Sequence, residues 1–269
     1  MKKTTLIASL GIIASFYSCK KKSDDGVKQI KTTVSITPKD AAWTLDKDRS
    51  DEFSALDTTK WSAAPLWYPT TEDLAFKTEN TTIINGVASL MAKKEGYNGS
   101  QYTAGCLKSK FLVGGDTYIE IRAKMVKKTA NICAAIWLGD DPTEVNNPNI
   151  EIDMQETKEA ETAANRVNSS LLTWPKPGSS NTVPGSSVFY LAKTLDEDFH
   201  LYGLERRNGK LSFYIDGINY WVWDASATPE FVTEPRPIIL SQEGHSGTPV
   251  DSELPADFQI DWVRVYNAK

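Results

Sequence analysis

The sequence has no excess of positive charge, no long apolar run and little cysteine. Its 30 Lys and Arg residues are outnumbered by 35 Asp and Glu, which gives a net charge of −5 and excludes the basic footprint of a nucleic-acid-binding protein. The apolar segment Leu6–Tyr17 is shorter than the roughly 20 residues that a membrane-spanning helix needs. Besides Cys19, the chain has two cysteines, Cys106 and Cys133, and both lie in apolar strand-like runs. A disulfide between them and two buried free thiols are both open alternatives.

The N-terminus has the organisation of a secretory signal. Lys2 and Lys3 precede the apolar run, which ends in Ser18-Cys19. A small residue directly before a cysteine resembles the lipobox of bacterial lipoproteins, which implies that residues 1–19 are a signal peptide and that Cys19 is lipidated. The alternative is that Cys19 is an ordinary residue beside a cleavage site, and export follows from either reading.

A tether and one domain are expected to follow. Residues 20–40 are charged, small or polar and offer little to bury, so they predict a flexible tether. The remaining residues, 41–269, fit one all-β domain, which we expect to be a monomer. The lipid would then be the sole membrane contact of an outer-membrane lipoprotein, and the acidic pair Asp24-Asp25 is a weak signal for the outer face of that membrane.

The pattern of the domain is that of a β-sandwich: short apolar runs alternate with Gly, Pro, Asn and Asp clusters. Asn85-Gly86, Asn208-Gly209 and Asp216-Gly217 predict tight hairpin turns. The main expected strands are 81–84, 87–90, 102–109, 117–127, 130–138, 150–156, 167–174, 199–206, 211–215, 220–223, 235–240 and 258–266.

Three acids occur within one expected strand, in the sequence Glu151-Ile152-Asp153-Met154-Gln155-Glu156. Side chains alternate along a strand, so Glu151 and Asp153 share a face and Glu156 would point to the other. One extra residue between Asp153 and Glu156, a β-bulge, would bring all three to one face. The outer two carboxyl groups would then lie about 5–6 Å apart, close to the roughly 5–5.5 Å of retaining glycosidases. The alternative is a strand that simply faces solvent.

Several further motifs occur in the order found in one enzyme family. They are Tyr102-Thr103-Ala104-Gly105 with Lys108-Ser109-Lys110, Tyr118-Ile119-Glu120-Ile121-Arg122, Ala135-Ile136-Trp137-Leu138, Phe199-His200-Leu201-Tyr202-Gly203-Leu204-Glu205, Phe213-Tyr214-Ile215-Asp216-Gly217 and Asp261-Trp262-Val263-Arg264-Val265-Tyr266. With the acidic motif, they make Trp43–Tyr266 resemble glycoside hydrolase family 16. That resemblance implies a concanavalin-like β-jelly roll, a sandwich of two antiparallel sheets with an open substrate cleft.

The resemblance also implies a role for each acid. Glu151 corresponds to the nucleophile, Glu156 to the general acid/base, and Asp153 to the carboxylate between them. Glu156 has to start protonated, and burial beside two negative charges would favour that form. This reaction needs no metal or other cofactor.

Six residues are candidates for substrate binding. Trp67, Trp137 and Trp174 offer aromatic faces for sugar rings, with core packing as the alternative for each. Glu243 and His245 lie in a Gly-containing segment after an apolar strand and could face the cleft. Arg166 could meet hydroxyl or sulfate groups, with a solvated surface charge as its alternative.

Two further residues are assigned by the resemblance to positions away from catalysis. His200 corresponds to a structural histidine. Asp261 corresponds to a position that binds a structural calcium in many family members, although one acid does not establish the several oxygen ligands that calcium requires.

The segment after residues 237–240 bears on the polysaccharide. β-1,3-Glucanase members usually carry Gly-Gly there, whereas this chain has Ser241-Gln242-Glu243, which is more similar to enzymes acting on red-algal galactans. The expected function is a retaining endo-hydrolase of porphyran or agarose. The alternatives are a laminarinase-type β-1,3-glucanase and a noncatalytic lectin-like protein that binds polysaccharide.

Overall fold

The computed structural model describes residues 42–68, 73–141, 149–157, 163–174, 182–245 and 247–269. The expectations for the signal peptide, Cys19 and the tether fall on residues 1–41 and lie outside this part of the chain. No helix in the described part is long and apolar enough to cross a membrane.

Two sheets account for most of the described residues, as the sequence predicted. A ten-stranded sheet contains β1 (Trp43–Asp51), β3 (Leu74–Phe76), β4 (Thr81–Ile84), β5 (Val87–Tyr97), β6 (Ser100–Ala104), β8 (Thr117–Lys124), β13 (His200–Arg207), β14 (Lys210–Ile215), β15 (Ile218–Asp224) and β17 (Ala256–Ala268). A seven-stranded sheet contains β2 (Trp61–Ser62), β7 (Cys106–Ser109), β9 (Cys133–Leu138), β10 (Asn149–Glu156), β11 (Arg166–Trp174), β12 (Thr182–Tyr190) and β16 (Ile238–Glu243). The short helices are η1 (Thr78–Asn80), η2 (Lys128–Ala130), α1 (Glu230–Thr233) and η3 (Asp251–Glu253).

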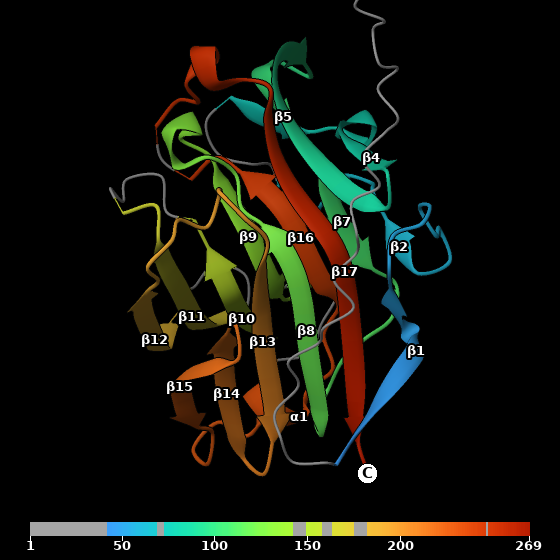
Figure 1. Ribbon diagram of the computed structural model, residues 1–269, viewed down its shortest axis with the longest axis vertical. Coiled ribbons are helices and arrows are strands. Elements are labelled where there is room, and N and C mark those ends of the chain that lie inside the picture. The colour runs from blue at the N-terminus through green and yellow to red at the C-terminus, as the bar shows by residue number, and fades with distance from the viewer. Residues whose placement is uncertain (1–41, 69–72, 142–148, 158–162, 175–181, 246) are drawn as a thin grey trace, which may run out of the picture. The chain divides into compact units, whose positions relative to one another are not determined.

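The two sheets pack face to face as an open jelly roll, and neither closes into a barrel. In Figure 1, β13, β8 and β17 cross in front of β10, β9 and β16. Alternate residues of these strands, such as Ile121 on β8, Ile136 on β9 and Val263 on β17, form one buried apolar cluster between the sheets. Burial of this apolar area is the main favourable term in folding, and it leaves the opposite face of the seven-stranded sheet to carry a site.

The three predicted hairpin turns are confirmed. Asn85-Gly86 joins β4 to β5, Asn208-Gly209 joins β13 to β14, and Asp216-Gly217 joins β14 to β15. Both residues of every pair have positive φ, between 49° and 78°, as the tight turns of twisted hairpins require.

One expected strand was wrong. Residues 102–109 form two strands, because the chain leaves the ten-stranded sheet with β6 and enters the seven-stranded sheet with β7. Gly105 lies at the crossing, where a Cβ would come within 2.6 Å of the Asn80 carbonyl oxygen. The pairing is also not wholly antiparallel, since β3 and β6 run parallel.

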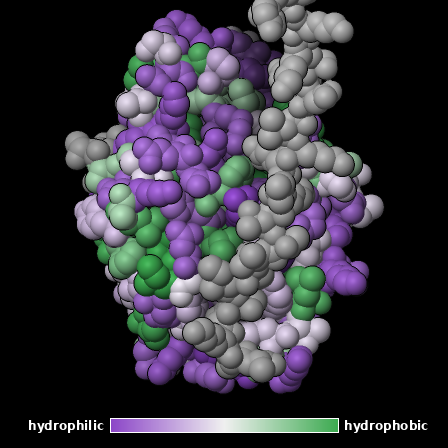
Figure 2. Space-filling model, viewed as in Figure 1, coloured by the Kyte–Doolittle hydropathy of each residue, from purple (hydrophilic) through white to green (hydrophobic). Residues whose placement is uncertain are grey.

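The surface seen in Figure 2 is mostly polar, with apolar side chains gathered at the lower left. Figure 1 has β15 in that region, and its Ile218 and Val222 are exposed. Apolar atoms contribute a large share of the surface of most folded proteins.

Candidate active site

The predicted bulge interrupts the pairing of β10 with β9. Asp153 pairs with Trp137, but the next pair is Gln155 with Ile136, followed by Glu156 with Ala135. Met154 is therefore the extra residue, and its side chain is buried in the core. The insertion returns Glu156 to the face that carries Glu151 and Asp153, as expected.

The register of the neighbouring strands brings further side chains to the same face. Trp137 lies opposite Asp153 on one side, and Ser170 of β11 lies opposite it on the other. The resulting cleft has a volume of about 550 Å³, which is sufficient for a sugar-sized ligand. It is lined by Trp67, Tyr68, Ala135, Trp137, Asp140, Asn149, Glu151, Asp153, Glu156, Trp174, Glu243, Gly244 and His245.

Each of the three acids has a defined partner in the cleft. Trp174 Nε1 donates a hydrogen bond of 2.7 Å to Glu151 Oε2. The Ser170 hydroxyl donates to Asp153 Oδ2 at 2.6 Å and lies 3.4 Å from Glu156 Oε2. Ser170 therefore fixes the middle acid beside Glu156, while Trp174 holds one oxygen of Glu151.

The electrostatics of the cleft favour retention of a proton among these carboxylates. The pKa of Glu151 is raised to about 7, chiefly by burial and also by the negative charges of Glu156 and Glu243, while hydrogen bonds from Trp174 and with Asp153 lower it. Because a donor stabilises the ionised form of a carboxylate, Trp174 favours the charged state of Glu151 within the set.

Glu243 is the centre of a second group of polar side chains. It accepts a hydrogen bond of 2.7 Å from the Tyr68 hydroxyl and another from Ser241. His245 Nε2 lies 2.8 Å from its second oxygen. Burial and the charge of Glu243 hold the pKa of Tyr68 well above its usual value, so the tyrosine is a constant hydrogen-bond donor.

The predicted aromatic residues line one wall of the cleft. Trp67 and Trp137 contact edge to face, with ring centroids 5.7 Å apart. Lys108 Nζ lies 5.1 Å from the centre of the Trp67 ring and forms a 2.6 Å ion pair with Asp140. Five of the six residues predicted to bind substrate, all except Arg166, therefore line the cleft.

Arg166 is not among the described residues that line this cleft. It lies at the start of β11 beside a small cavity that also contacts Glu156 and Asn168. Arg166 and Trp174 are the two ends of the nine-residue strand β11, which lie about 25–30 Å apart. Trp174 lines the cleft, so Arg166 lies well away from that end of it.

Ser170 and Asn149 were not predicted from the sequence as site residues. Both face the cleft because of their pairing in the sheet: Ser170 lies opposite Asp153, and Asn149 lies opposite Trp174. The alternation of side chains along the expected strands could have identified such residues, because residues two apart on a strand share a face.

Two residues expected outside catalysis also have clear partners. His200 Nδ1 lies 2.7 Å from Asp216 Oδ2, and its ring is buried, consistent with the structural role implied by the resemblance. Asp261 accepts a hydrogen bond of 2.7 Å from Arg122. Arg122 therefore partners one carboxylate oxygen of Asp261, and Asp261 belongs to no group of three Asp, Glu, His or Cys ligand atoms in the described residues.

No disulfide joins Cys106 to Cys133, and both side chains are buried. Cys106 Sγ donates to the Ala64 carbonyl oxygen at 3.4 Å. Cys133 lies on β9 with its side chain on the cleft side of the sheet, two residues before Ala135.

A jelly-roll sandwich with paired carboxylates in an aromatic cleft has the features of a glycoside hydrolase. The family model described as "Beta-porphyranase A-D, GH16 domain" matches residues 43–268. The chain belongs to glycoside hydrolase family 16, a family of endo-acting enzymes.

The names of individual relatives refer to different polysaccharides. The chain is 28% identical to a κ-carrageenase of Pseudoalteromonas carrageenovora over 203 residues, which is 65% of this chain and 50% of that protein. It is 30% identical to a β-glucanase of Acetivibrio thermocellus over 221 residues, which is 80% of this chain and 61% of that protein. The chain thus spans about half to three-fifths of the length of these relatives.

A solved structure supports the fold. The endo-β-1,3-glucanase of Pyrococcus furiosus superimposes with a TM-score of 0.72 at 25% identity, covering 86% of this chain and 97% of that one.

Proposed function

We propose that this protein cleaves internal β-linkages of a red-algal galactan, agarose or porphyran, with retention of anomeric configuration. The choice of a galactan as substrate rests on the match of residues 43–268 to the porphyranase family model. The κ-carrageenase relative adds a second galactan enzyme. The three acids on one face of β10 support the reaction type.

The reaction proceeds in two displacements. In the first, an oxygen of Glu151 attacks the anomeric carbon, the bond to the leaving sugar breaks, and Glu156 gives its proton to the leaving oxygen. In the second, Glu156 takes a proton from water, whose oxygen attacks the same carbon and releases Glu151 as a carboxylate. Trp174 orients the attacking oxygen of Glu151 through the 2.7 Å hydrogen bond.

Asp153 acts between these two groups. Its carboxylate is held by Ser170, and it hydrogen-bonds with Glu151. The hydrogen bond with Asp153 lowers the pKa of Glu151 and so favours the ionised nucleophile that the first displacement needs. Both half-reactions therefore use one proton, which is returned to Glu156 at the end.

The charge of the cleft bears on which sugars it accepts. Apart from His245, the charged side chains among its described lining residues are acidic: Asp140, Glu151, Asp153, Glu156 and Glu243. Like charges repel strongly where water is excluded, so a sulfate on the sugar beside the acids is disfavoured. Neutral galactose units, as in agarose or unsulfated stretches of porphyran, are the preferred occupants.

The test is a comparison of agarose, porphyran, κ-carrageenan, laminarin and mixed-linkage glucan by release of reducing ends. Glu156→Gln should lower hydrolysis by about 10²–10⁴-fold, and Glu151→Gln by at least as much. Glu79→Gln, an exposed acid on η1, is the matched control and should leave the rate unchanged. NMR of the first product should show the retained anomer, and an inverted product contradicts the assigned roles.

A β-1,3-glucanase is the second candidate, supported by the likeness to the Pyrococcus enzyme and to the Acetivibrio β-glucanase. Cleavage of laminarin alone would replace the galactan proposal with this one. Binding of a polysaccharide without cleavage of any of the five would favour the lectin-like alternative.

A further inference from the structure

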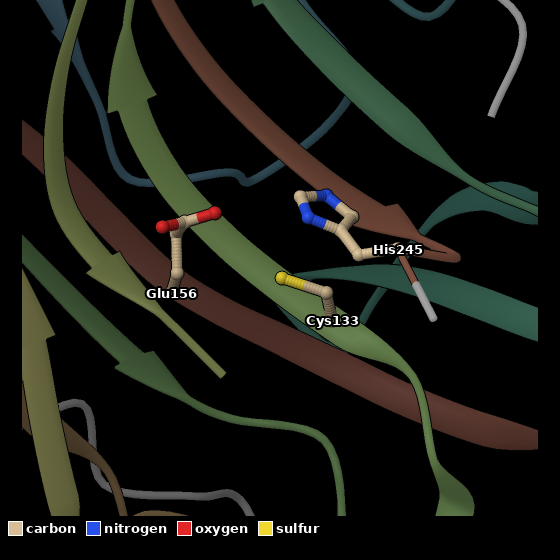
Figure 3. Close-up of side chains that lie close together, drawn as sticks. All are labelled: Cys133, Glu156 and His245. Carbon is tan, nitrogen blue, oxygen red and sulfur yellow. The ribbon is translucent and has the colours of Figure 1, made fainter. Parts of the chain in front are cut away.

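Cys133, Glu156 and His245 meet on one wall of the cleft. Cys133 begins β9, Glu156 ends β10, and His245 lies two residues after β16. One ligand atom from each lies within 4.8 Å of the other two, and the described residues contain no second group of three His, Cys, Asp or Glu that does so. Figure 3 shows the sulfur, the carboxylate and the imidazole converging.

The sheet register accounts for this meeting. Glu156 lies opposite Ala135, and Cys133 is two residues from Ala135 on the same face of β9. Glu243 lies opposite Cys133 on the other side, so the turn through Gly244 carries His245 back over the sulfur. The three ligand atoms are therefore positioned by three adjacent strands of a hydrogen-bonded sheet.

The environment of His245 is that of a metal ligand. Its Nε2 lies 2.8 Å from Glu243 Oε2, and Glu243 is itself held by Tyr68 and Ser241. Metal-binding histidines commonly donate their second ring N–H to such a carboxylate, which fixes the tautomer and makes the first nitrogen more basic. Nδ1 is then the ligand atom.

The donor set selects the type of ion. Calcium and magnesium take oxygen ligands, whereas one sulfur, one nitrogen and one carboxylate oxygen suit zinc, which accepts all three. Bond lengths of about 2.0–2.3 Å place tetrahedral ligands about 3.3–3.8 Å apart. The three atoms therefore need to close by no more than about 1.5 Å, a movement available to side-chain rotation.

We propose that Cys133, Glu156 and His245 bind a zinc-type divalent cation with water as the fourth ligand, and that the bound cation blocks hydrolysis by engaging the Glu156 carboxylate. Binding releases the proton of the Cys133 thiol, because the thiolate is the ligand. The inhibitory part rests on the proposed function, since it requires Glu156 to be the proton donor. The binding part stands without it.

Titration of the reduced full-length protein with Cd²⁺ tests binding directly, through the thiolate-to-metal absorption band. The wild type should show the band at one equivalent, and Zn²⁺ should displace Cd²⁺. Cys133→Ala should lose the band, whereas Cys106→Ala, which removes the other buried thiol and leaves the same number of cysteines, should keep it. An equal band in Cys133→Ala, or no band in the wild type, overturns the site.

Two further measurements separate folding and function from binding. Cys133→Ser and His245→Gln should each weaken Zn²⁺ binding by at least about 10-fold, with circular dichroism confirming that both variants are folded. Saturating Zn²⁺ should lower hydrolysis by at least about 10-fold in the wild type and Cys106→Ala, reversibly with a chelator, while Cys133→Ala stays active. Metal binding with full hydrolysis refutes inhibition. If no polysaccharide is cleaved, the titration still decides the site.

Discussion

The hydrogen bond from Trp174 to Glu151 predicts how activity depends on pH. Trp174→Phe keeps an aromatic ring in the cleft and removes the N–H that lies 2.7 Å from Glu151 Oε2. That donor stabilises the ionised carboxylate, so its loss raises the pKa of Glu151 above the value of about 7 in the intact cleft. Because the nucleophile must be ionised, activity falls on the acidic side of the profile.

The size of the effect follows from the strength of a hydrogen bond to a charged group. Such bonds contribute about 1.5–3 kcal/mol. The lower end of this range applies because Trp174 and Glu151 are each partly exposed to solvent. At about 1.4 kcal/mol per pKa unit, the acidic limb of kcat/KM should move up by about one unit. At about pH 6, kcat/KM should therefore fall about 10-fold, with most of the loss recovered at higher pH.

The assay is kcat/KM from pH 5 to 9 by release of reducing ends, on whichever polysaccharide the protein cleaves best. Trp67→Phe is the matched control, since Trp67 lines the same cleft and has no hydrogen bond to Glu151 among those of the described residues. It should change binding without moving the acidic limb. An unchanged limb in Trp174→Phe, or an equal shift in both variants, refutes the role given to this hydrogen bond.

Three other changes test separate parts of the chain. Gly139→Ala brings a Cβ within 2.5 Å of the Trp137 ring, so it should lower unfolding free energy by about 1–3 kcal/mol and alter the near-UV circular dichroism. Asp216→Asn should lower stability by about 1 kcal/mol between about pH 4 and 6.5, and less outside that window, in urea melts at several pH values. Cys19→Ser should abolish incorporation of labelled palmitate in a bacterial host, which tests lipidation.

The pH window of Asp216 follows from its pairing with His200. Burial lowers the pKa of His200, but the hydrogen bond and charge of Asp216 outweigh burial and raise it. The stability that the protonated His200 contributes is complete below the pKa of histidine in the unfolded chain, about 6.5, and is lost as pH rises through the pKa of His200 in the folded protein. Burial raises the pKa of Asp216, but the hydrogen bond from His200 and the other interactions outweigh burial and lower it. The stability that the ionised Asp216 contributes is therefore lost as pH falls below about 4.

The controls for these changes are close in chemistry. Gly96→Ala adds a Cβ with nothing within 4 Å and should leave the near-UV spectrum unchanged. A flat stability difference across pH for Asp216→Asn would contradict the ion pair. Undiminished labelling of Cys19→Ser would contradict lipidation at that residue.

Features that depend on local chemistry could be predicted from the sequence. The Asn-Gly and Asp-Gly turns demand positive φ at both positions, which few other residues tolerate. The bulge at Met154 followed from the spacing of Glu151, Asp153 and Glu156, because only one extra residue restores their common face.

Features that depend on which strands become neighbours could not be predicted. Nothing local in residues 102–109 marks a change of sheet except Gly105, and a glycine within a strand has several explanations. Ser170 and Tyr68 reach the cleft through pairing and packing with segments 17 and 175 residues away along the chain. The position of Arg166 outside the cleft lining has the same origin, because the expected strand did not determine which of its ends enters the cleft.

The bulge reconciles two demands that the acidic strand places on the fold. Ile150 and Ile152 must alternate into the core, which commits odd-numbered positions to the cleft. A regular strand would continue this alternation and bury Glu156 opposite Ala134 in the core, where an unpaired carboxylate costs several kcal/mol. With Met154 inserted, an apolar side chain fills the core and Glu156 lies opposite Ala135. Ala135 is a small residue, so the space above it in the cleft is open to the Glu156 carboxyl group and to a sugar.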